Sequence, residues 1–524
     1  MDARPISRRS FLRLSALLAG GVTLLSACSS QPAAPAKPAE PAKPAEPAKP
    51  AEAAKPAEAA KPAAPAAAAA PTQAAPAAKP ADPAKPAAAA SGKPVSPLAA
   101  AGGLKETTIT LIMFSGPEVD AHTRLAPKFT EYTKGKVKVQ IEEGGRGDAY
   151  DAKFLAGMQA KTTAWDVLHD NGPRFLTSGP AGFFAPLSPF MNDKDLFDSE
   201  AYNNDDFPKA LRDVFSYEGE QLCMVQEASG LLLNYRKDLL QKYGVPEPPL
   251  EGYDWDTFMG HLKTLQDGLA KDGKTDVYPL LFGAKRPAHS YRHNQHYTWG
   301  KGGEVYNGIT PNYDDPAMIE SFTVLPSLVY DKKFVSEGAV GYEYPDVLTG
   351  FQAGKAVTAF QWNAAAPTFL DASKSPETAG KIGFSMMPYF KDKGTKIARH
   401  DPSPHALGVS AYSKNQKEAF AYVAWFTSQE IARDYVVNGG GSSGRGTLLT
   451  DKTILEKNPQ YAALNEVLKL QKPYPQMEQY LYVANTILAS HAGAIWSKQE
   501  TAEAGLKAAK AEAIQYLKEQ GAKL

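Results

Sequence analysis

The segment QLCMVQEASGLLLNYRKDLLQKYGV, residues 221–245, decides the expected fold. Two apolar runs, residues 222–225 and 231–233, are joined by the link QEASG, which contains a glycine. Short runs rich in leucine and valine on either side of a glycine indicate a strand, a kink and a second strand. The residues NYRKDLL then begin a helix, which we expect to end before Gly244 because a valine and a proline follow that glycine.

Strands and helices alternate in the sequence before this segment. The composition of residues 107–114, 137–141 and 165–169 indicates strands, and residues 120–133 and 151–160 are expected to be helices. Strands that alternate with helices predict a parallel sheet with right-handed crossovers. In open α/β sheets, ligands bind beyond the carboxyl ends of the strands. The residues that follow each strand are therefore the first candidates for a binding site.

Polar and aromatic residues occur at these strand ends. They are Phe114 and Glu118 after the first strand, Arg146 and Asp148 after the second, and Asp170 and Asn171 after the third. Each polar residue could instead cap a helix or lie in a solvated loop. Asp148 is the strongest candidate for a cap, because a helix is expected to begin just after it.

Length, charge and cysteine content narrow the class of protein. The folded part, residues 104–524, is too long for a single hydrophobic core and predicts two lobes. The formal net charge of +0 argues against a nucleic-acid partner. Apart from Cys28, the only cysteine is Cys223, which lies in an apolar run, so we expect a buried thiol and no disulfide within the chain.

The N-terminal residues carry the pattern of an export signal. SRRSFL, with Arg8 and Arg9, matches the twin-arginine pattern, and residues 14–25 form an apolar stretch too short to span a membrane. LSAC, which ends at Cys28, resembles a bacterial lipobox, whose cysteine is lipidated. We therefore expect residues 1–28 to be a signal peptide that ends at the lipobox cysteine, and the exported protein to be anchored by lipid to the outer face of the cytoplasmic membrane. The alternative is a cytoplasmic protein with a chance pair of arginines.

Residues 29–103 form a low-complexity segment built from variants of AAKPAE. The segment has almost no large apolar side chains, so it cannot bury enough surface to offset the entropy of ordering it. Frequent proline favours extended polyproline II. We expect a disordered tether that lifts the folded part away from the membrane.

Several segments of the folded part resemble the extracellular solute-binding proteins of ABC importers, family 1, the maltose-binding-protein-like sugar-binding lipoproteins. LLLNYRKDLLQKYGVPEPPLEGYDWDTF, residues 231–258, follows that family's pattern, with an inverted Asn-Tyr order and an insertion before Trp255. WGKGGE at residues 299–304 and GKAVTAFQW at residues 354–362 follow two further patterns of the family. The resemblance extends over nearly all of the folded part, as scattered motifs rather than continuous similarity.

The resemblance implies an α/β fold of the periplasmic-binding-protein kind, type II-like, with two lobes joined by hinge strands. Crossings at Glu227 and at residues 355–362 would divide the folded part into two discontinuous lobes. Lobe one would comprise residues 104–226 plus 357–430, and lobe two residues 227–356 plus 431–524. The implied function is capture of a small solute in the interlobe cleft by a monomer, and delivery to the transmembrane permease subunits of an ABC transporter. It implies no cofactor.

We expect the solute to be a carbohydrate. Sugars present flat CH faces and a ring of hydroxyls, so their sites combine aromatic platforms with charged or amide groups. Phe114, Trp299 and Trp362 are the candidate platforms, although a lone tryptophan is more often a core residue. The polar candidates are Glu118, Arg146, Asp148, Asp170, Asn171, Glu227, His400 and Asp401. A peptide, a polyol phosphate or a metal is the alternative solute; Arg146, Arg399 and His400 could bind an anion.

Other classes of protein need features that the sequence lacks. His289, His293 and His296 would share one helix face, but no cysteine or nearby carboxylate completes a metal shell, so we expect a polar helix face with one histidine turned to the ligand, and no metal. A hydrolase would need a G-x-S-x-G elbow in its strand-turn-helix context or an H-E-x-x-H motif, and neither occurs, so we expect no enzyme. A sensor or adhesin lipoprotein without a permease remains an alternative.

Overall fold

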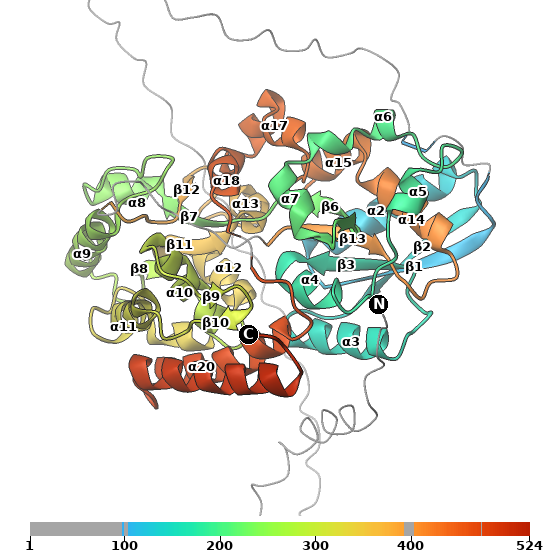
Figure 1. Cartoon of the computed structure of the whole chain (residues 1–524). Coiled ribbons are helices and arrows are strands. Elements are labelled where there is room, and N and C mark those ends of the chain that lie inside the picture. The colour runs from blue at the N-terminus through green and yellow to red at the C-terminus, as the bar shows by residue number, and fades with distance from the viewer. Residues whose placement is uncertain (1–96, 99–102, 392–402, 473) are drawn as a thin grey trace, which may run out of the picture. The chain divides into compact units, whose positions relative to one another are not determined.

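The structure is a computed structural model that describes residues 97–98, 103–391, 403–472 and 474–524. Those residues belong to one compact unit, which contains an α/β fold (Figure 1). The signal peptide expected at residues 1–28, with Arg8, Arg9 and Cys28, and most of the expected tether lie outside the described residues. Leu98 is already buried in the folded unit and bridges to Phe197, so the folded part begins a few residues before the expected boundary at residue 104.

The first sheet has five strands in the order β2-β1-β3-β13-β6. They are β1 (Thr107–Met113), β2 (Val137–Glu143), β3 (Val167–Asn171), β6 (Cys223–Glu227) and β13 (His405–Val409). β1 pairs in parallel with β2 and β3, which confirms the sequence expectation, and β13 runs antiparallel between β3 and β6. Helices α2 (Pro117–Tyr132) and α3 (Asp148–Gln159) form the expected crossovers.

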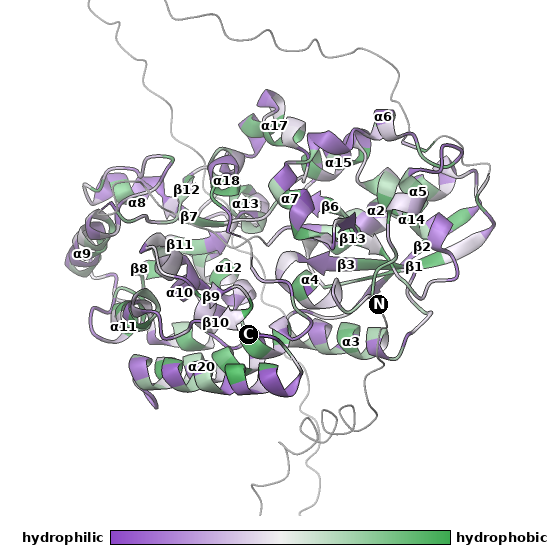
Figure 2. Ribbon diagram, in the orientation of Figure 1, coloured by the Kyte–Doolittle hydropathy of each residue, from purple (hydrophilic) through white to green (hydrophobic). Residues whose placement is uncertain are grey.

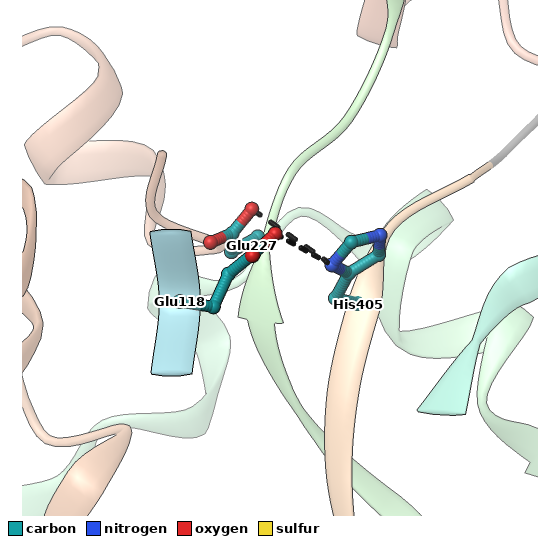
Figure 3. A group of neighbouring side chains, drawn as sticks. All are labelled: Glu118, Glu227 and His405. Carbon is teal, nitrogen blue, oxygen red and sulfur yellow. Dashed lines mark ion pairs between the residues drawn. The ribbon is translucent and has the colours of Figure 1, made fainter. Parts of the chain in front are cut away.

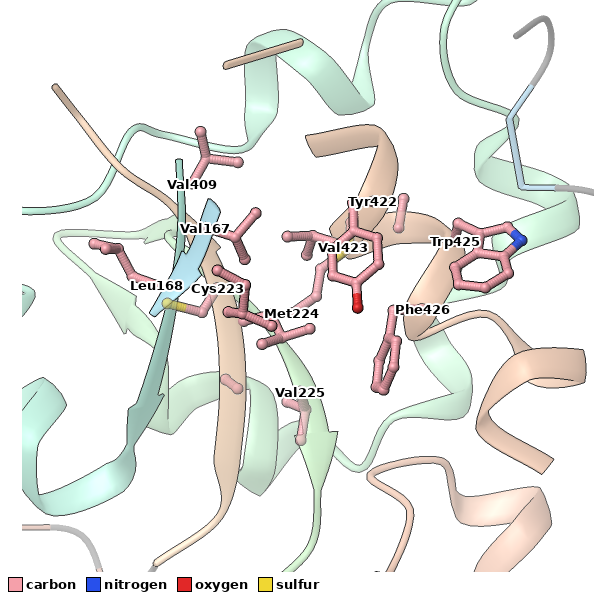
Figure 4. Packing of buried hydrophobic residues seen from close by; sticks show 14 of the residues in the cluster. Val167, Leu168, Cys223, Met224, Val225, Val409, Tyr422, Val423, Trp425 and Phe426 are labelled. Carbon is pink, nitrogen blue, oxygen red and sulfur yellow. The ribbon is translucent and has the colours of Figure 1, made fainter. Parts of the chain in front are cut away.

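Apolar side chains of this sheet pack against helix α14 (Gln416–Phe426). Figure 4 shows Val167, Cys223 and Val409 on the strand side of this core, and Tyr422 and Phe426 on the helix side. Cys223 is fully buried there, as its apolar run predicts. Burying several such side chains stabilises the lobe by about 1.5–3 kcal/mol for each of the larger ones.

The second sheet has four strands in the order β12-β7-β11-β8. They are β7 (Leu231–Arg236), β8 (Tyr278–Leu281), β11 (Ala356–Trp362) and β12 (Ile382–Met386). Its core is built with α9 (Trp255–Lys271), α10 (His289–Gly300), α11 (Pro316–Tyr330), α19 (Ala489–Trp496) and α20 (Ala502–Glu519). In α20 hydrophobic and hydrophilic residues alternate (Figure 2), and the face with Leu506, Ala509, Ala513 and Leu517 is buried.

Shorter elements complete the two lobes. Around the first sheet lie α4 (Gly172–Ser178), α5 (Ser188–Met191), α6 (Ser199–Tyr202), η2 (Asn204–Asp206), α7 (Lys209–Val214), β4 (Ser216–Tyr217) and β5 (Glu220–Gln221). The second part of the chain adds α8 (Lys237–Lys242), β9 (Tyr306–Asn307), β10 (Thr310–Pro311), η3 (Glu337–Gly341), α12 (Tyr344–Gln352), η4 (Asn363–Ala365), α13 (Ala366–Leu370), α15 (Gln429–Val437), α16 (Gly446–Leu449), α17 (Lys452–Lys457), α18 (Gln460–Leu468) and the π-helix η5 (Tyr482–Leu488). No helix of the described residues has the length and apolarity that a membrane crossing requires.

The link QEASG connects the two sheets, because β6 belongs to the first sheet and β7 to the second. The backbone of Gly230 is held by Asn363, whose Oδ1 accepts from the Gly230 N–H at 2.8 Å and whose own N–H donates to the Gly230 carbonyl at 3.0 Å. A Cβ atom at Gly230 would lie 2.7 Å from Val467 Cγ1, so a side chain does not fit here. The segment that the sequence marks as strand, kink, strand is thus the first connection between the lobes.

The second connection differs from the sequence expectation. β11 pairs with β7 and β8, and β12 also pairs with β7, so both strands belong to the second sheet, and the chain does not return to the first lobe at residue 357. The chain next enters the first sheet at β13. The motif at residues 354–362 is therefore a strand of the second sheet. Its apolar run predicts a strand correctly, but cannot show which sheet the strand joins.

The expected division of the C-terminal part also needs correction. Tyr435, Leu448 and Ile454, after residue 431, lie in the core of the first sheet. Helix α18 serves both lobes, because Leu464 joins the first core and Val467 joins a core of the second sheet. The final helices α19 and α20 belong to the second core, as expected.

Candidate ligand-binding site

One edge of the first sheet gathers most of the candidate residues. β1, β3 and β6 end at this edge, and the antiparallel strand β13 begins there, so His405 stands opposite both Asn171 and Glu227. Glu118 reaches the same edge from the first turn of α2, where a carboxylate is favoured by the helix dipole. The candidates from three strand ends are thus brought together, as the parallel topology predicts.

Glu118, Glu227 and His405 form the centre of this edge (Figure 3). His405 Nδ1 lies 3.8 Å from Glu118 Oε1 and 4.0 Å from Glu227 Oε2. Both glutamates are buried, with exposed fractions of 3% and 1%. Glu227 Oε1 accepts a hydrogen bond from the Tyr435 hydroxyl, whereas Glu118 Oε2 has no hydrogen-bond partner.

The protonation of this group follows from its burial. Burial raises the pKa of Glu118, and the positive charge of Arg146 opposes part of that rise. Burial, and then the charge of Glu118, raise the pKa of Glu227 well above its ordinary value. Burial lowers the pKa of His405 to about 3, with smaller contributions from Arg146 and Arg174. His405 is therefore neutral at pH 7, and its contacts with the two glutamates are not ion pairs.

Arg146 extends from the first lobe toward the second. Its Nη1 donates to the Ser115 carbonyl at 3.0 Å, and its guanidinium carbon lies 4.7 Å from the ring centre of Tyr344, at the start of α12. Phe114 is mostly buried, with its ring centre 4.4 Å from that of His169 and 5.0 Å from that of His405. Arg146 thus contacts residues of both lobes, and the Phe114 ring packs against that of His405.

Asp170 and Asn171 have partners inside the first lobe. Asp170 is fully buried, and it accepts from Arg174 Nη1 at 3.0 Å and from the Ser178 hydroxyl. Burial raises its pKa to about 6, although Arg174 favours the charged form. Asn171 Oδ1 caps α4 by accepting from the Arg174 N–H at 3.0 Å. Asn171 therefore takes the capping role that the sequence left open, and Asp170 forms a buried ion pair with Arg174.

The two candidate tryptophans lie in different surroundings. Trp362 is half-buried at the end of β11, and its ring centre lies 5.4 Å from that of His289 and 6.3 Å from that of Tyr344. Trp299 is only 3% exposed and packs against Tyr474 in the core of the second lobe. Trp299 is therefore a core residue, whereas Trp362, which is partly exposed, stays a candidate platform.

The three helix histidines do not form a metal group among the described residues. Their helix is α10, as expected, but His293 packs near Phe282 and Phe360, and His296 lies near Trp299. Burial lowers the pKa of His289 to about 3, so its ring is neutral beside Trp362. His400, Asp401 and the side chain of Asp148 lie outside the described residues; Gly147 occupies the N-cap of α3.

A cavity of about 360 Å³ opens beside Glu118. Its walls come from α2 of the first lobe, from the segment around α13 of the second lobe, and from a glycine-rich loop at residues 438–441. The lining residues are Glu118, Asp120, Ala121, Arg124, Ala364, Pro367, Thr368, Asp371, Lys374, Asn438, Gly439, Gly440 and Gly441. Apart from Glu118, the sequence analysis did not select them. The run of three glycines at residues 439–441 was the sequence feature that could have indicated this wall of the cavity.

Replacing Gly441 by alanine is expected to lower the free energy of unfolding by about 1–3 kcal/mol, because its φ of 136° is strained for an L-residue. The new Cβ would also lie 2.2 Å from Glu227 Oε1, so it should displace that carboxylate. Gly439→Ala is the control, since Gly439 also has a positive φ but its Cβ would meet nothing within 4 Å. Thermal unfolding of both variants measures the two losses of stability. Equal losses for Gly441→Ala and Gly439→Ala would show that the Glu227 side chain can move away from the new Cβ without cost.

Solved structures support the fold at low sequence identity. Maltose-bound MalE3 of T. maritima is 21% identical and matches with a TM-score of 0.69, covering 78% of this chain and 100% of that chain. A solute-binding protein of an ABC transporter from Agrobacterium radiobacter, solved with ribitol, is also 21% identical, with a TM-score of 0.69 and coverage of 79% and 99%. The two-lobe α/β architecture is that of these periplasmic solute-binding proteins.

Similarity to curated proteins covers a smaller part of the chain. A probable ABC transporter-binding protein of Deinococcus radiodurans is 25% identical over 252 residues, which span 48% of this chain and 57% of that protein. The matches therefore span less than two thirds of the length of such relatives, and one from Sinorhizobium fredii spans 27%. The model of the bacterial extracellular solute-binding proteins matches residues 116–433, more than half of the chain. The chain belongs to the bacterial extracellular solute-binding protein family.

Proposed function

We propose that the protein is the exported substrate-binding subunit of an ABC importer, and that it binds a carbohydrate or polyol between its lobes. The observation that carries the proposal is the cavity beside Glu118, whose walls come from both lobes. Solved relatives of the same architecture hold maltose, ribitol and D-mannitol, which are neutral polyhydroxy compounds. Family and fold are those of binding proteins, so we propose no catalytic role.

The chemistry of the cleft fits hydroxyl groups. Carboxylate oxygens accept short, strong hydrogen bonds from hydroxyls, and Glu118 Oε2 is a buried acceptor without a partner. Asp120 and Asp371 add acceptors to the cavity, and Arg124 and Lys374 add donors. Trp362 and Tyr344 stand close together on the side of the second lobe, where either ring could contact a sugar face. The mixture of both charges suits a neutral polar solute.

A thermal-shift screen of the full chain tests this function. The panel is maltose, ribitol, D-mannitol and glycerophosphocholine, with single amino acids and dipeptides as the competing class. A compound at 100 times its dissociation constant should stabilise the folded protein by about 2.7 kcal/mol. We expect shifts among the sugars or polyols. Shifts confined to amino acids or dipeptides would contradict the proposed solute.

We also propose that the protein is delivered as a lipoprotein and presents its solute, as a monomer, to the permease subunits of the transporter. The N-terminal sequence supports this, because the twin arginines, the apolar stretch and the lipobox follow one another in register. The tether would then give the folded unit reach above the membrane. A sensor or adhesin role without a permease is the alternative. Solute uptake should be lost on deletion of the gene if the importer role is correct.

Replacing Cys28 by alanine should release the exported protein from the membrane fraction, because the acyl chains supply about 0.8 kcal/mol of membrane binding per buried CH₂ group. Replacing both Arg8 and Arg9 by lysine should instead block export. Fractionation and immunoblotting distinguish the two results. Ser29→Ala is the matched control and should change neither. Undiminished membrane binding of Cys28→Ala would contradict lipidation, and normal export of the lysine variant would indicate the general secretory route.

A further inference from the structure

The group of Glu118, Glu227 and His405 is unusual because its polar atoms face one another without making hydrogen bonds to one another. One ligand atom from each side chain lies within 4.8 Å of the other two. The two His405 separations, 3.8 and 4.0 Å, are too long for hydrogen bonds. Figure 3 shows the imidazole and the two carboxylates directed toward the same gap. A bound group smaller than a sugar could contact all three side chains in this gap.

Two polar atoms of this group lack any hydrogen-bond partner; the Glu118 oxygen among them, Oε2, is the second oxygen of the carboxylate whose Oε1 lies 3.8 Å from His405. His405 Nδ1 and Glu118 Oε2 are both buried and unpartnered, and Glu118 as a whole is only 3% exposed. Leaving such atoms unpaired costs about 1–3 kcal/mol for each group, and more when the group is charged. Among the described residues, no lysine or arginine nitrogen lies within 4.0 Å of either glutamate. Arg146 is close enough for its charge to act on both glutamates, but its Nη1 donates to the Ser115 carbonyl, so neither carboxylate forms an ion pair with a lysine or arginine among the described residues.

We propose that Glu118, Glu227 and His405 bind a divalent transition-metal ion, of which Zn²⁺ is the best match, at the floor of the cleft. One imidazole nitrogen with two carboxylates is a ligand set that suits Zn²⁺ or Mn²⁺ and disfavours Mg²⁺ and Ca²⁺, which prefer oxygen ligands alone. Three protein ligands leave a position open for water or for a hydroxyl of the solute. The inference goes beyond solute capture and does not require that the solute be a sugar.

The geometry requires the three ligand atoms, which lie within 4.8 Å of one another, to move closer together on binding. Zinc ligands at about 2.0–2.2 Å from the ion stand roughly 3.3–3.6 Å apart in a tetrahedral site. The observed separations from His405 are therefore longer by a few tenths of an ångström. Glutamate side chains can close such a gap by rotating. The backbone is already fixed, because His405 pairs with Glu227 across β13 and β6, and Glu118 is held in the first turn of α2.

A second histidine provides a matched control. His491, on α19, also lies between two glutamates, at 2.9 Å from Glu500 and 3.3 Å from Glu512. There the two glutamates contact different ring nitrogens, so they cannot share one ion with a single nitrogen of His491. Replacing His491 by glutamine removes a histidine near two carboxylates without touching the proposed site.

The test is isothermal titration of the chelator-treated full chain with ZnSO₄ and MnCl₂, without any sugar. We expect one Zn²⁺ site, with Mn²⁺ weaker. Glu227→Gln and His405→Gln should each weaken Zn²⁺ binding at least 100-fold, since loss of an outer-shell partner alone costs about 10–100-fold. His491→Gln should bind as the wild type does. Circular dichroism verifies folding, and either of the first two variants suffices if the other does not fold.

Three results would overturn the proposal. They are the absence of Zn²⁺ binding, binding that persists in both Glu227→Gln and His405→Gln, and binding that is lost in His491→Gln. The solute screen repeated with chelator present keeps the two claims apart, because sugar binding without metal binding would refute only the metal site. Binding of glucosamine but not of glucose, with no Zn²⁺ site, would assign the same acceptors to an ammonium group and would also refute it.

Discussion

Replacing Arg174 by methionine is expected to lower the free energy of unfolding by about 3–5 kcal/mol, because it leaves a buried carboxylate without its cation. Arg174 is 4% exposed, and it pairs with Asp170 at 3.0 Å and with Asp151 at 2.6 Å. Asp170 is fully buried. Methionine keeps much of the apolar volume but supplies no charge, so the loss measures the pairing rather than the packing.

Arg433→Met is the control for this measurement. Arg433 also pairs with an aspartate, Asp451, but its side chain is 45% exposed, and exposed pairs contribute about 0–1 kcal/mol. Urea unfolding followed by circular dichroism gives both free energies. A loss of stability for Arg174→Met as small as that for Arg433→Met would show that the buried ion pair of Arg174 with Asp170 does not stabilise the fold.

Trp299→Ala is expected to lower stability, whereas Trp362→Ala is expected to weaken solute binding. Trp299 is buried in the second core, so its removal should cost about 3–5 kcal/mol of stability. Trp362 is half-buried and is the proposed aromatic platform, so its removal should mainly weaken binding of the solute. An aromatic residue at the centre of an interface contributes at least about 2 kcal/mol, which corresponds to roughly 30-fold in dissociation constant.

Thermal unfolding and titration with the sugar or polyol from the screen separate the two effects. Trp362→Phe is the matched control, because it keeps an aromatic face and should retain most of the affinity. If Trp299→Ala bound the solute 30-fold more weakly while keeping its stability, Trp299 would be the platform that the sequence suggested. The roles of the two tryptophans would then be exchanged.

The first half of the fold was predictable because its signals are local. The parallel strands of the first sheet are short runs that are either apolar or alternate apolar with polar residues, and each crossover helix follows a polar loop, so both the elements and the shared edge follow from the sequence. The link at residues 226–230 was predictable for the same reason. Its glycine and polar residues interrupt two apolar runs, and the structure places those runs in different sheets.

The later part was harder because its arrangement depends on contacts between distant residues. The run at residues 356–362 is a strand in either lobe; only its pairing with β7 and β8 places it in the second sheet. His405 joins the site because β13 lies antiparallel between β3 and β6, and no local pattern shows that register. Gly441 lies beside Glu227 although the two residues are more than 200 positions apart in the sequence, and no local pattern shows that contact either.

Burial decided the remaining differences at the site. The sequence does not show whether Trp299 or Trp362 is buried. In the structure, Trp299 packs against Tyr474 in the second core, whereas Trp362 is half-buried. Asp170 and Asn171 follow a strand as a ligand residue would, yet both are occupied by Arg174. Position along the chain therefore predicts which residues reach the edge, whereas side-chain packing determines which of them remain available to a solute.

Amide hydrogen exchange with and without the solute tests most directly whether the solute binds between the lobes. The probe is the sugar or polyol that gives the largest thermal shift, added to the full chain at saturation. We predict slower exchange on both sides of the cavity, at residues 118–124 and 438–441 from the first lobe and at residues 364–374 from the second. Protection confined to one lobe, or no protection at these residues, would contradict a solute held between the two lobes.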